Sequence, residues 1–457
     1  MNNLNQPWYR ELTRYHWFVL TVASLGWLFD TLDQQLFTYA RVPAITELLR
    51  ESPDAPRPAQ KAIDLYGGIS TSVFLLGWAT GGLAFGILGD RIGRAKTMVW
   101  TILVYSAFTG LSALSRNVYD FAFYRFLTGL GVGGEFAVGV ALVAEVMPDR
   151  ARPHALGLLQ ALSAVGNISA ALVGVSFTEL EAAEVVTQGW GWRWMFVVGT
   201  GPALLALVIR RRLKEPERWQ AAAHDGVVAK QLGSFAELFG DPRWRRNALA
   251  GMALAFAGVV GLWGIGFFSP DLQRSIFRKT FEAQGMSPAE VNQQLGRWTA
   301  LSLVLQNIGG FFGIYAYSRL THRVGRKPAF VVSFLAALAS TMMVFWFMDD
   351  FYDIFWMIPL MGFCQLSLFG GYAIYFPELF PTRLRSTGTS FCYNVGRFAA
   401  AAGPLTLGYL TSAVFTPENG FTELPMRYAG VTMCSVFLIG LVALPFLPET
   451  RGQPLPE

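Results

Sequence analysis

Long apolar runs alternate with short polar stretches along the whole chain. A helix that crosses the hydrocarbon core of a bilayer needs about 20 mostly apolar residues, and these runs have that length. Many runs are rich in Gly and Ala, as is typical of helices that pack closely in membranes. The pattern predicts twelve spanning helices, at residues 17–40, 69–90, 97–115, 121–146, 154–178, 192–210, 248–270, 299–319, 328–348, 353–376, 385–412 and 427–447.

Composition supports this reading. Hydrophobic residues make up 53% of the 457 positions and charged residues only 15%, with a mean hydropathy of +0.37. Soluble domains carry about 25% charged residues, so a soluble fold is excluded. The first sixteen residues are polar and the apolar run after them is too long for a secretory signal, so no cleaved leader is expected.

The distribution of Lys and Arg predicts orientation and domain organisation. Basic residues concentrate in the short loops on the side of the N-terminus, which fits the positive-inside rule better than nucleic-acid binding. We therefore expect a multi-pass protein of the cell (inner) membrane with both termini in the cytoplasm. The longest polar stretch on that side predicts a linker at 211–247 between an N-terminal half, 1–210, and a C-terminal half, 248–457.

Internal repeats support two related halves. GDRIGR (Gly89–Arg94) returns as THRVGRK (Thr321–Lys327) at an offset of 232 positions. The pattern E-x-x-P-x-R-x-R, which begins at Glu145 and again at Glu378, returns at an offset of 233. A third and weaker similarity relates KEPER (Lys214–Arg218) to PETRG (Pro448–Gly452), near the ends of the two halves. Parallel six-helix repeats are a known transporter architecture.

These motifs resemble those of the major facilitator superfamily. GILGDRIGR is similar to its loop signature and RFLTGLGVGGE (Arg125–Glu135) to its fourth-helix motif, while PELFPTRLRSTG and PETRGQPLPE resemble the branch of sugar porters, organic-ion carriers and metabolite–proton symporters. The resemblance implies an all-α polytopic membrane protein, with twelve transmembrane helices in two six-helix repeats around a central cavity. The resemblance also implies that the protein transports by alternating access and works as a monomer. The chain lacks the QQxSG and GPxPW patterns of hexose carriers.

Charged residues at the predicted cytoplasmic helix ends suggest a gate. Ion pairs between the halves at this depth would close the inside and break when the halves rock. By the resemblance, Asp90 caps the eleventh helix, where a negative charge suits the helix N-terminus. The alternative is that these charges only set topology. The expected gate residues are Asp90, Arg91, Arg94, Glu145, Arg152, Arg323, Arg326, Glu378 and Arg385.

The first predicted helix carries two acids inside the membrane. Asp30 and Asp33 are three residues apart and share one helix face. Charges inside a span are costly and therefore functional candidates, and a buried carboxyl can carry a proton. Arg125, in the outer part of the fourth helix, is expected to pair with Asp33 and couple proton binding to substrate binding. A solvated helix end, or a purely structural pair, remains the alternative.

Arg397 lies near the middle of the eleventh predicted helix. A mid-membrane arginine must face a cavity or a partner, and its fork of donors matches a carboxylate. By resemblance to the organic-ion carriers, arginine at this spacing after Pro381 and Thr382 indicates an anionic substrate; a structural pair with Asp30 is the alternative. Weaker substrate-binding candidates, each of which could equally serve helix packing, are Gln160, Asn394, Trp263, Gln306 and Tyr372, with Asn167 and Asn307 beside them.

These features favour proton-coupled symport of a small organic anion, a monocarboxylate such as an aromatic or sugar acid. A sugar or polyol transporter and an organic cation or drug exporter are the alternatives. No two of the four histidines are three or four residues apart, and the three cysteines lack metal or disulfide spacing. We therefore expect no enzyme activity, cofactor, metal or nucleic-acid partner. The expected ligands are a solute, a proton and the lipid bilayer; a receptor without transport is a remote alternative.

Overall fold

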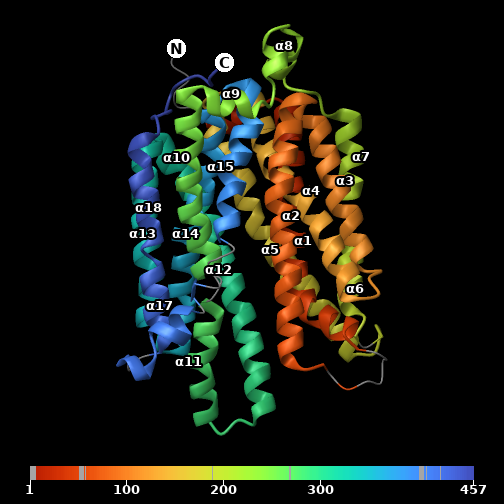
Figure 1. Cartoon of the computed structure of the whole chain (residues 1–457), viewed down its shortest axis with the longest axis vertical. Helices are drawn as coiled ribbons and strands as arrows, with labels where there is room; N and C mark the ends of the chain where they lie inside the picture. Colours follow the sequence, from red (N-terminus) through yellow and green to blue (C-terminus); the bar gives the residue numbers. More distant parts are fainter. Residues whose placement is uncertain are drawn as a thin grey trace.

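A computed structural model of the chain describes residues 7–457, except 51–55, 57, 188, 267–268, 401–405, 408 and 422–423. The described part forms one bundle of long helices (Figure 1). Both chain ends lie at the same end of the bundle, together with the short helices α8 (Glu217–His224) and α9 (Phe235–Gly240). We call this end the terminal face, and the other end the opposite face.

The first half of the chain forms one side of the bundle. Its sixth predicted span is divided in two by a turn that contains Gly199, Gly201 and Pro202, residues that do not favour continuous helix. The helices of this half are α1 (Arg14–Leu48), α2 (Gln60–Arg91), α3 (Arg94–Ser112), α4 (Val118–Val146), α5 (Arg152–Ala182), α6 (Gly191–Val198) and α7 (Ala203–Arg212).

The second half forms the other side. Its first helix continues as a π-helix over Val260–Ile265, and α11 with the start of α12 forms a hairpin at the opposite face (Figure 1). The helices of this half are α10 (Pro242–Val259), α11 (Ser269–Ala283), α12 (Pro288–Val324), α13 (Arg326–Phe347), α14 (Met357–Tyr375), α15 (Arg385–Ala400), α17 (Pro425–Met433) and α18 (Val436–Ala443).

Seven of the described helical segments are long and apolar enough by themselves to cross a membrane. The other predicted spans correspond to helices that carry charges, such as α1, or that are interrupted, such as α6 and α7. The helix α12 is longer than expected and begins at Pro288 rather than at residue 299. Its polar start PAEVNQQLGRW continues the helix after a Ser287 capping box, which fixes the first turn.

Glycines allow the closest helix contacts within each half. A Cβ atom on Gly133 of α4 would lie 2.0 Å from the Trp78 carbonyl oxygen of α2. A Cβ atom on Gly313 of α12 would likewise lie 2.0 Å from the Phe363 carbonyl oxygen of α14. The two halves meet mainly where α2 packs on α15 and where α5 packs on α12.

The weak sequence similarity between KEPER and PETRG has a structural basis. Glu215 accepts hydrogen bonds from two backbone N–H groups at the start of α3, both at 3.1 Å. Glu449 likewise accepts from two backbone N–H groups at the start of α13, those of Arg326 and Lys327, at 2.8 and 3.0 Å. Gly93 and Gly325, with φ of 109° and 101°, precede these helices in a backbone conformation that favours glycine.

Candidate functional site

A buried ion pair joins α1 to α4 within the first half. Arg125 Nη1 lies 3.7 Å from Asp33 Oδ2, as the sequence predicts, and neither side chain is exposed. Thr109 of α3 donates a 2.6 Å hydrogen bond to the other oxygen of Asp33. Arg125 also donates to Ser112 and Thr128, at 2.7 and 3.0 Å. The distance between the two charged groups is long for an ion pair, and Arg125 Nη1 has no hydrogen-bond partner among the described residues. Protonation of Asp33 would therefore weaken the ion pair easily.

Asp30 lies one turn before Asp33, fully buried and less well satisfied. Its Oδ2 accepts a 3.4 Å hydrogen bond from Gln34, and its Oδ1 has no partner among the described residues. No guanidinium nitrogen of a described residue lies within 4.0 Å of it. The expected alternative of a direct structural pair with Arg397 is therefore absent in this conformation, although Arg397 is near enough for electrostatic attraction.

Glu135 of α4 is a third buried acid that the sequence analysis left without a role. It is 1% exposed, and Thr101 of α3 donates a 2.6 Å hydrogen bond to its Oε2. The signal was present in the sequence, because Glu135 is an acid inside the predicted span 121–146. The resemblance of RFLTGLGVGGE to a fourth-helix motif pointed to Arg125 instead.

Arg397 lies on α15 against aromatic rings of both halves. It is 4% exposed, and its guanidinium carbon lies 3.9 Å from the ring centroid of Trp78 and 4.6 Å from that of Tyr393. The Tyr393 ring stacks on Phe136 at 3.9 Å, and Phe136 packs against Trp27 at 4.9 Å. In the described part of the chain no carboxylate lies within 4.0 Å of Arg397, and its Nε has no hydrogen-bond partner.

The weaker substrate candidates divide into two groups. Gln160 and Gln306 are buried side chains of α5 and α12, and Gln160 Oε1 lacks a described partner. Asn394 of α15 donates to Ser390 at 3.0 Å and contacts α2 at Gly82, so it lies where the halves meet.

Tyr372 does not face this region. Its hydroxyl donates a 2.9 Å hydrogen bond to the Leu254 carbonyl, and its ring stacks between Phe330 and Phe376 inside the second half. An aromatic residue in an apolar span can face the core of its own half as well as a cavity, and Tyr372 does the former. The side chain of Trp263 lies outside the described residues.

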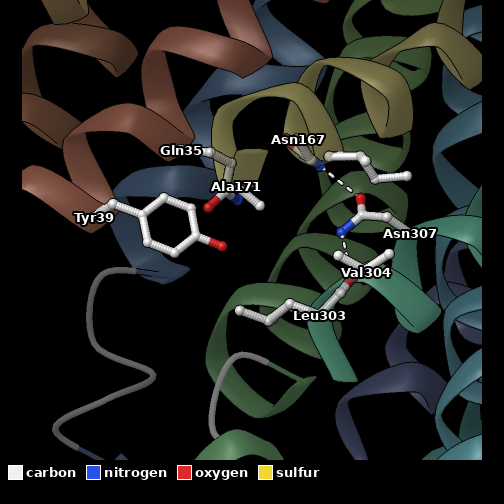
Figure 2. A pocket seen from close by; sticks show the side chains of 8 residues that line it. Gln35, Tyr39, Asn167, Ala171, Leu303, Val304 and Asn307 are labelled. Carbon is white, nitrogen blue, oxygen red and sulfur yellow. Dashed lines mark hydrogen bonds between the residues drawn. The ribbon is translucent and has the colours of Figure 1, made fainter. Parts of the chain in front are cut away.

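A small cavity lies between α1, α5 and α12 (Figure 2). Its polar lining consists of Gln35, Tyr39, Asn167 and Asn307. Asn167 Nδ2 donates a 2.8 Å hydrogen bond to Asn307 Oδ1, which links the two halves. Gln35 and Tyr39 were not predicted, because nothing in the sequence says which face of α1 turns toward α12.

Buried charges close the terminal face between the halves. Glu145 Oε1 accepts from Arg94 of its own half at 2.9 Å and from Arg385 of the other half at 2.8 Å, and all three side chains are fully buried. Arg94 also donates to the Thr382 carbonyl at 2.7 Å. Asp90 accepts from the backbone N–H groups of Ser386 and Thr387 at 3.1 and 2.8 Å, so it caps α15 as expected.

The remaining expected gate residues are arranged differently. Glu378 pairs with Arg326 at 2.8 Å, inside the second half, and Arg152 pairs with Asp149, inside the first. Arg91 and Arg323 are exposed and lie outside this ion-pair network; Arg91 donates to the Leu232 carbonyl of the 211–247 segment at 3.3 Å. Both side chains extend from the last turn of their helix, α2 or α12, toward the exterior. Their position in the repeated motif therefore does not by itself put them in the gate.

An aromatic stack crosses the halves on the other side of the terminal face. His154 at the start of α5 lies 5.3 Å from His322 at the end of α12, measured between ring centroids. Trp8, in the 3₁₀ helix Trp8–Glu11, stacks on His154 at 5.4 Å. Sequence reasoning missed this contact, because it considered these histidines only as catalytic or metal-binding groups.

Comparisons with known proteins agree with this architecture. The model of the Major Facilitator Superfamily matches residues 42–404. The niacin transporter NiaP of Acinetobacter baylyi is 27% identical over 468 residues, which cover 97% of this chain and 96% of that protein. The cis,cis-muconate transport protein of the same organism is 29% identical over 442 residues, or 94% of each chain.

Among solved structures, the fold is similar to that of the proton:xylose symporter XylE of E. coli. The TM-score is 0.73 at 17% identity, over 96% of this chain and 98% of that one, a similarity that concerns the fold alone. The family match, the helical bundle and its repeated halves lead to one conclusion. The chain belongs to the Major Facilitator Superfamily, and is a multi-pass membrane transporter with twelve helices in two six-helix repeats rather than an enzyme.

Proposed function

We propose that the chain transports a small organic anion together with a proton, and that Arg397 binds a carboxylate of the substrate. The observation that carries the proposal is the position of Arg397, a buried guanidinium between the halves with no carboxylate of the described residues within 4.0 Å. A buried charge without a counterion is costly. A substrate carboxylate would supply that counterion and match the fork of guanidinium donors.

The surroundings of Arg397 favour a planar, unsaturated acid. Trp78 and Tyr393 place aromatic rings beside the guanidinium, and Phe136 and Trp27 extend this aromatic surface into the first half. Flat rings or conjugated chains pack well on such surfaces. The names of two relatives, a niacin transporter and a cis,cis-muconate transport protein, are consistent with this class of substrate.

The proton would bind to the acids of α1. With the terminal face in the cytoplasm and closed, as the charge distribution suggests, a proton from outside binds at Asp33 and loosens its pair with Arg125. The anion then binds at Arg397. The halves rock, the contacts of Glu145 and Asp90 with the second half separate, and both ligands leave on the cytoplasmic side.

Uptake into proteoliposomes tests the proposal. Labelled benzoate, nicotinate, lactate, sialic acid, glucose and choline are offered with an acidic outside, with and without a protonophore. Accumulation of an acid that collapses with the protonophore is the expected result. Uptake of glucose that does not respond to the protonophore would refute the proposal.

A pair of arginine variants tests the binding role of Arg397. Arg397→Gln loses charge-assisted hydrogen bonds, worth about 1.5–3 kcal/mol, so substrate affinity should fall roughly 10- to 150-fold. Arg427→Gln is the matched control. Arg427 is another mostly buried arginine of the second half, but its donors are used by the Trp346 and Met348 carbonyls and by Asp349. Equal losses in the two variants would show that Arg397 acts only in folding.

A further inference from the structure

Glu135 is the buried acid that the proposed cycle leaves unused. It lies ten residues after Arg125 on α4, about 15 Å further toward the terminal face at 1.5 Å per residue. Thr101 is its one described hydrogen-bond donor, and its Oε1 has no described partner. A half-satisfied carboxylate inside a membrane bundle is expensive, and such groups in transporters mark ion or proton sites.

The unpartnered oxygen of Glu135 points at α1. A Cβ atom added to Gly26 would lie 2.3 Å from Glu135 Oε1, so only a glycine admits the carboxylate there. Gly26 lies one helical turn before Asp30 and on the same face. Asp30 also has an unpartnered oxygen, Oδ1, and the two carboxyl groups are near enough to repel each other.

The other charged and titratable groups around this pair come from α1, which carries Asp33, and from α3 and α15. The phenol of Tyr105, on α3, is fully buried and lies within electrostatic range of Glu135, Asp30 and Asp33. Arg397 and its neighbour Tyr393 face Asp30 from α15.

The charges of this interior do not balance. Three carboxylates face two guanidinium groups, which leaves a net charge of −1 when all five groups are ionised, and the pair of Asp33 with Arg125 is already neutral. Arg397 can offset one of the two remaining carboxylates until a substrate anion takes it. In the loaded state of the proposed cycle Asp33 is protonated, so the substrate monoanion and these five groups sum to −1. One proton on the Glu135 and Asp30 carboxylates then restores neutrality.

Resting on the proposed function, we propose that Glu135 and Asp30 form a second proton-binding pair, distinct from Asp33 and Arg125, that holds one proton when the substrate anion is bound. The proton comes from water on the open side, forms an O–H bond with a carboxylate oxygen of the pair, and returns to water on the other side. No bond of the substrate changes. Gly26 and Thr101 position the Glu135 carboxylate.

Glu135→Gln separates proton coupling from the other steps of transport. Glutamine cannot release a proton but keeps the size of the side chain and an acceptor for Thr101. We expect loss of proton-driven accumulation, while counterflow of labelled for unlabelled substrate continues. Glu282→Gln, an exposed acid of α11, is the control and should behave as the unaltered protein. Size-exclusion chromatography and thermal unfolding in detergent verify folding.

A second variant keeps the test independent of Glu135 itself. Thr101→Val removes the hydrogen bond that favours the charged carboxylate, so the pH profile of uptake should move to higher pH while counterflow persists. Full proton-driven accumulation by Glu135→Gln would overturn the proposal. So would loss of both accumulation and counterflow in the folded variant, because Glu135 would then serve substrate binding or rocking. If the unaltered protein accumulates no acid, the proposed function itself fails.

Discussion

The substitution Glu145→Gln should open the terminal face. Glu145 is the acid that joins two fully buried arginines, Arg94 of its own half and Arg385 of the other. When the halves separate at this face, the contact with Arg94 can persist but the contact with Arg385 must break. Of the two contacts of Glu145, only the bond with Arg385 therefore contributes to the balance between closed and open forms.

The magnitude follows from that single bond. A hydrogen bond between charged groups contributes about 1.5–3 kcal/mol. The amide introduced by Glu145→Gln would retain a neutral acceptor oxygen for one of the two guanidinium groups. The ratio of closed to open molecules should then fall about 10- to 150-fold, since 1.4 kcal/mol corresponds to a factor of about ten.

The repeat provides a matched control in Glu378→Gln. Glu378 occupies the equivalent place in the second half, but it bonds to Arg326 and Thr450 of that same half, at 2.8 and 2.5 Å. Removal of one partner from such a buried pair costs roughly 3–5 kcal/mol of folding stability. We expect Glu378→Gln to lower the melting temperature without opening the terminal face.

Distances between spin labels distinguish these outcomes. Lys96→Cys and Arg323→Cys place labels on exposed positions of the two halves at the terminal face, after replacement of the three buried cysteines. Glu145→Gln should shift the distance distribution toward longer values, and Glu378→Gln should not. An unchanged distribution for Glu145→Gln, or an equal shift for both variants, would refute the reasoning.

Three further outcomes can be checked by thermal unfolding in detergent. Asp90→Asn should lose part of the α15 cap, about 0.5–2 kcal/mol, and an unchanged melting temperature would contradict the capping role. Gly133→Ala should force α4 from α2 at a cost of about 1–3 kcal/mol, whereas the control Gly139→Ala, with its nearest neighbour at 3.5 Å, should be tolerated. Burial raises the pKa of Glu449, but backbone N–H groups of α13 and Arg451 lower it more, to a net value below the usual range. Its stabilisation is therefore complete above the unfolded pKa of about 4.3 and is lost as pH falls through the lower folded value, so Glu449→Gln should flatten the acid side of the stability profile.

Sequence reasoning worked best where a motif acts inside one half or at a helix end. The resemblance of GDRIGR to the family's loop signature predicted the cap of α15 by Asp90, and the depth of Arg125 predicted its pair with Asp33. The partner of Arg125 follows from helix direction and depth, which apolar runs of known length reveal. The similarity of KEPER and PETRG includes Glu215 and Glu449, but their hydrogen bonds to the starts of α3 and α13 were not predicted.

It worked least where a side chain's orientation depends on a neighbouring helix. Glu135 and Tyr372 are both polar-tipped residues inside apolar spans, yet Glu135 faces α1 at Gly26 and Tyr372 packs between Phe330 and Phe376. The pattern of apolar positions carries little rotational information in helices that are surrounded by other helices or lipid, because all faces are then apolar. The length of α12 was missed for a related reason, since a helix outside the membrane follows caps rather than hydropathy.

The two copies of the repeat agree inside each half and differ where the halves meet. Arg94 with Glu145 and Arg326 with Glu378 are equivalent pairs, but only Glu145 also reaches an arginine of the other half. The position equivalent to Asp90, which caps α15, is His322, which lies against His154 instead. One side of the terminal face is thus closed by buried charges and the other by neutral or weakly basic rings. Because rings without ion pairs separate at lower electrostatic cost, opening of this face should depend chiefly on the contacts of Glu145 and Asp90, which is why the Glu145 variant is the most direct test of the cycle.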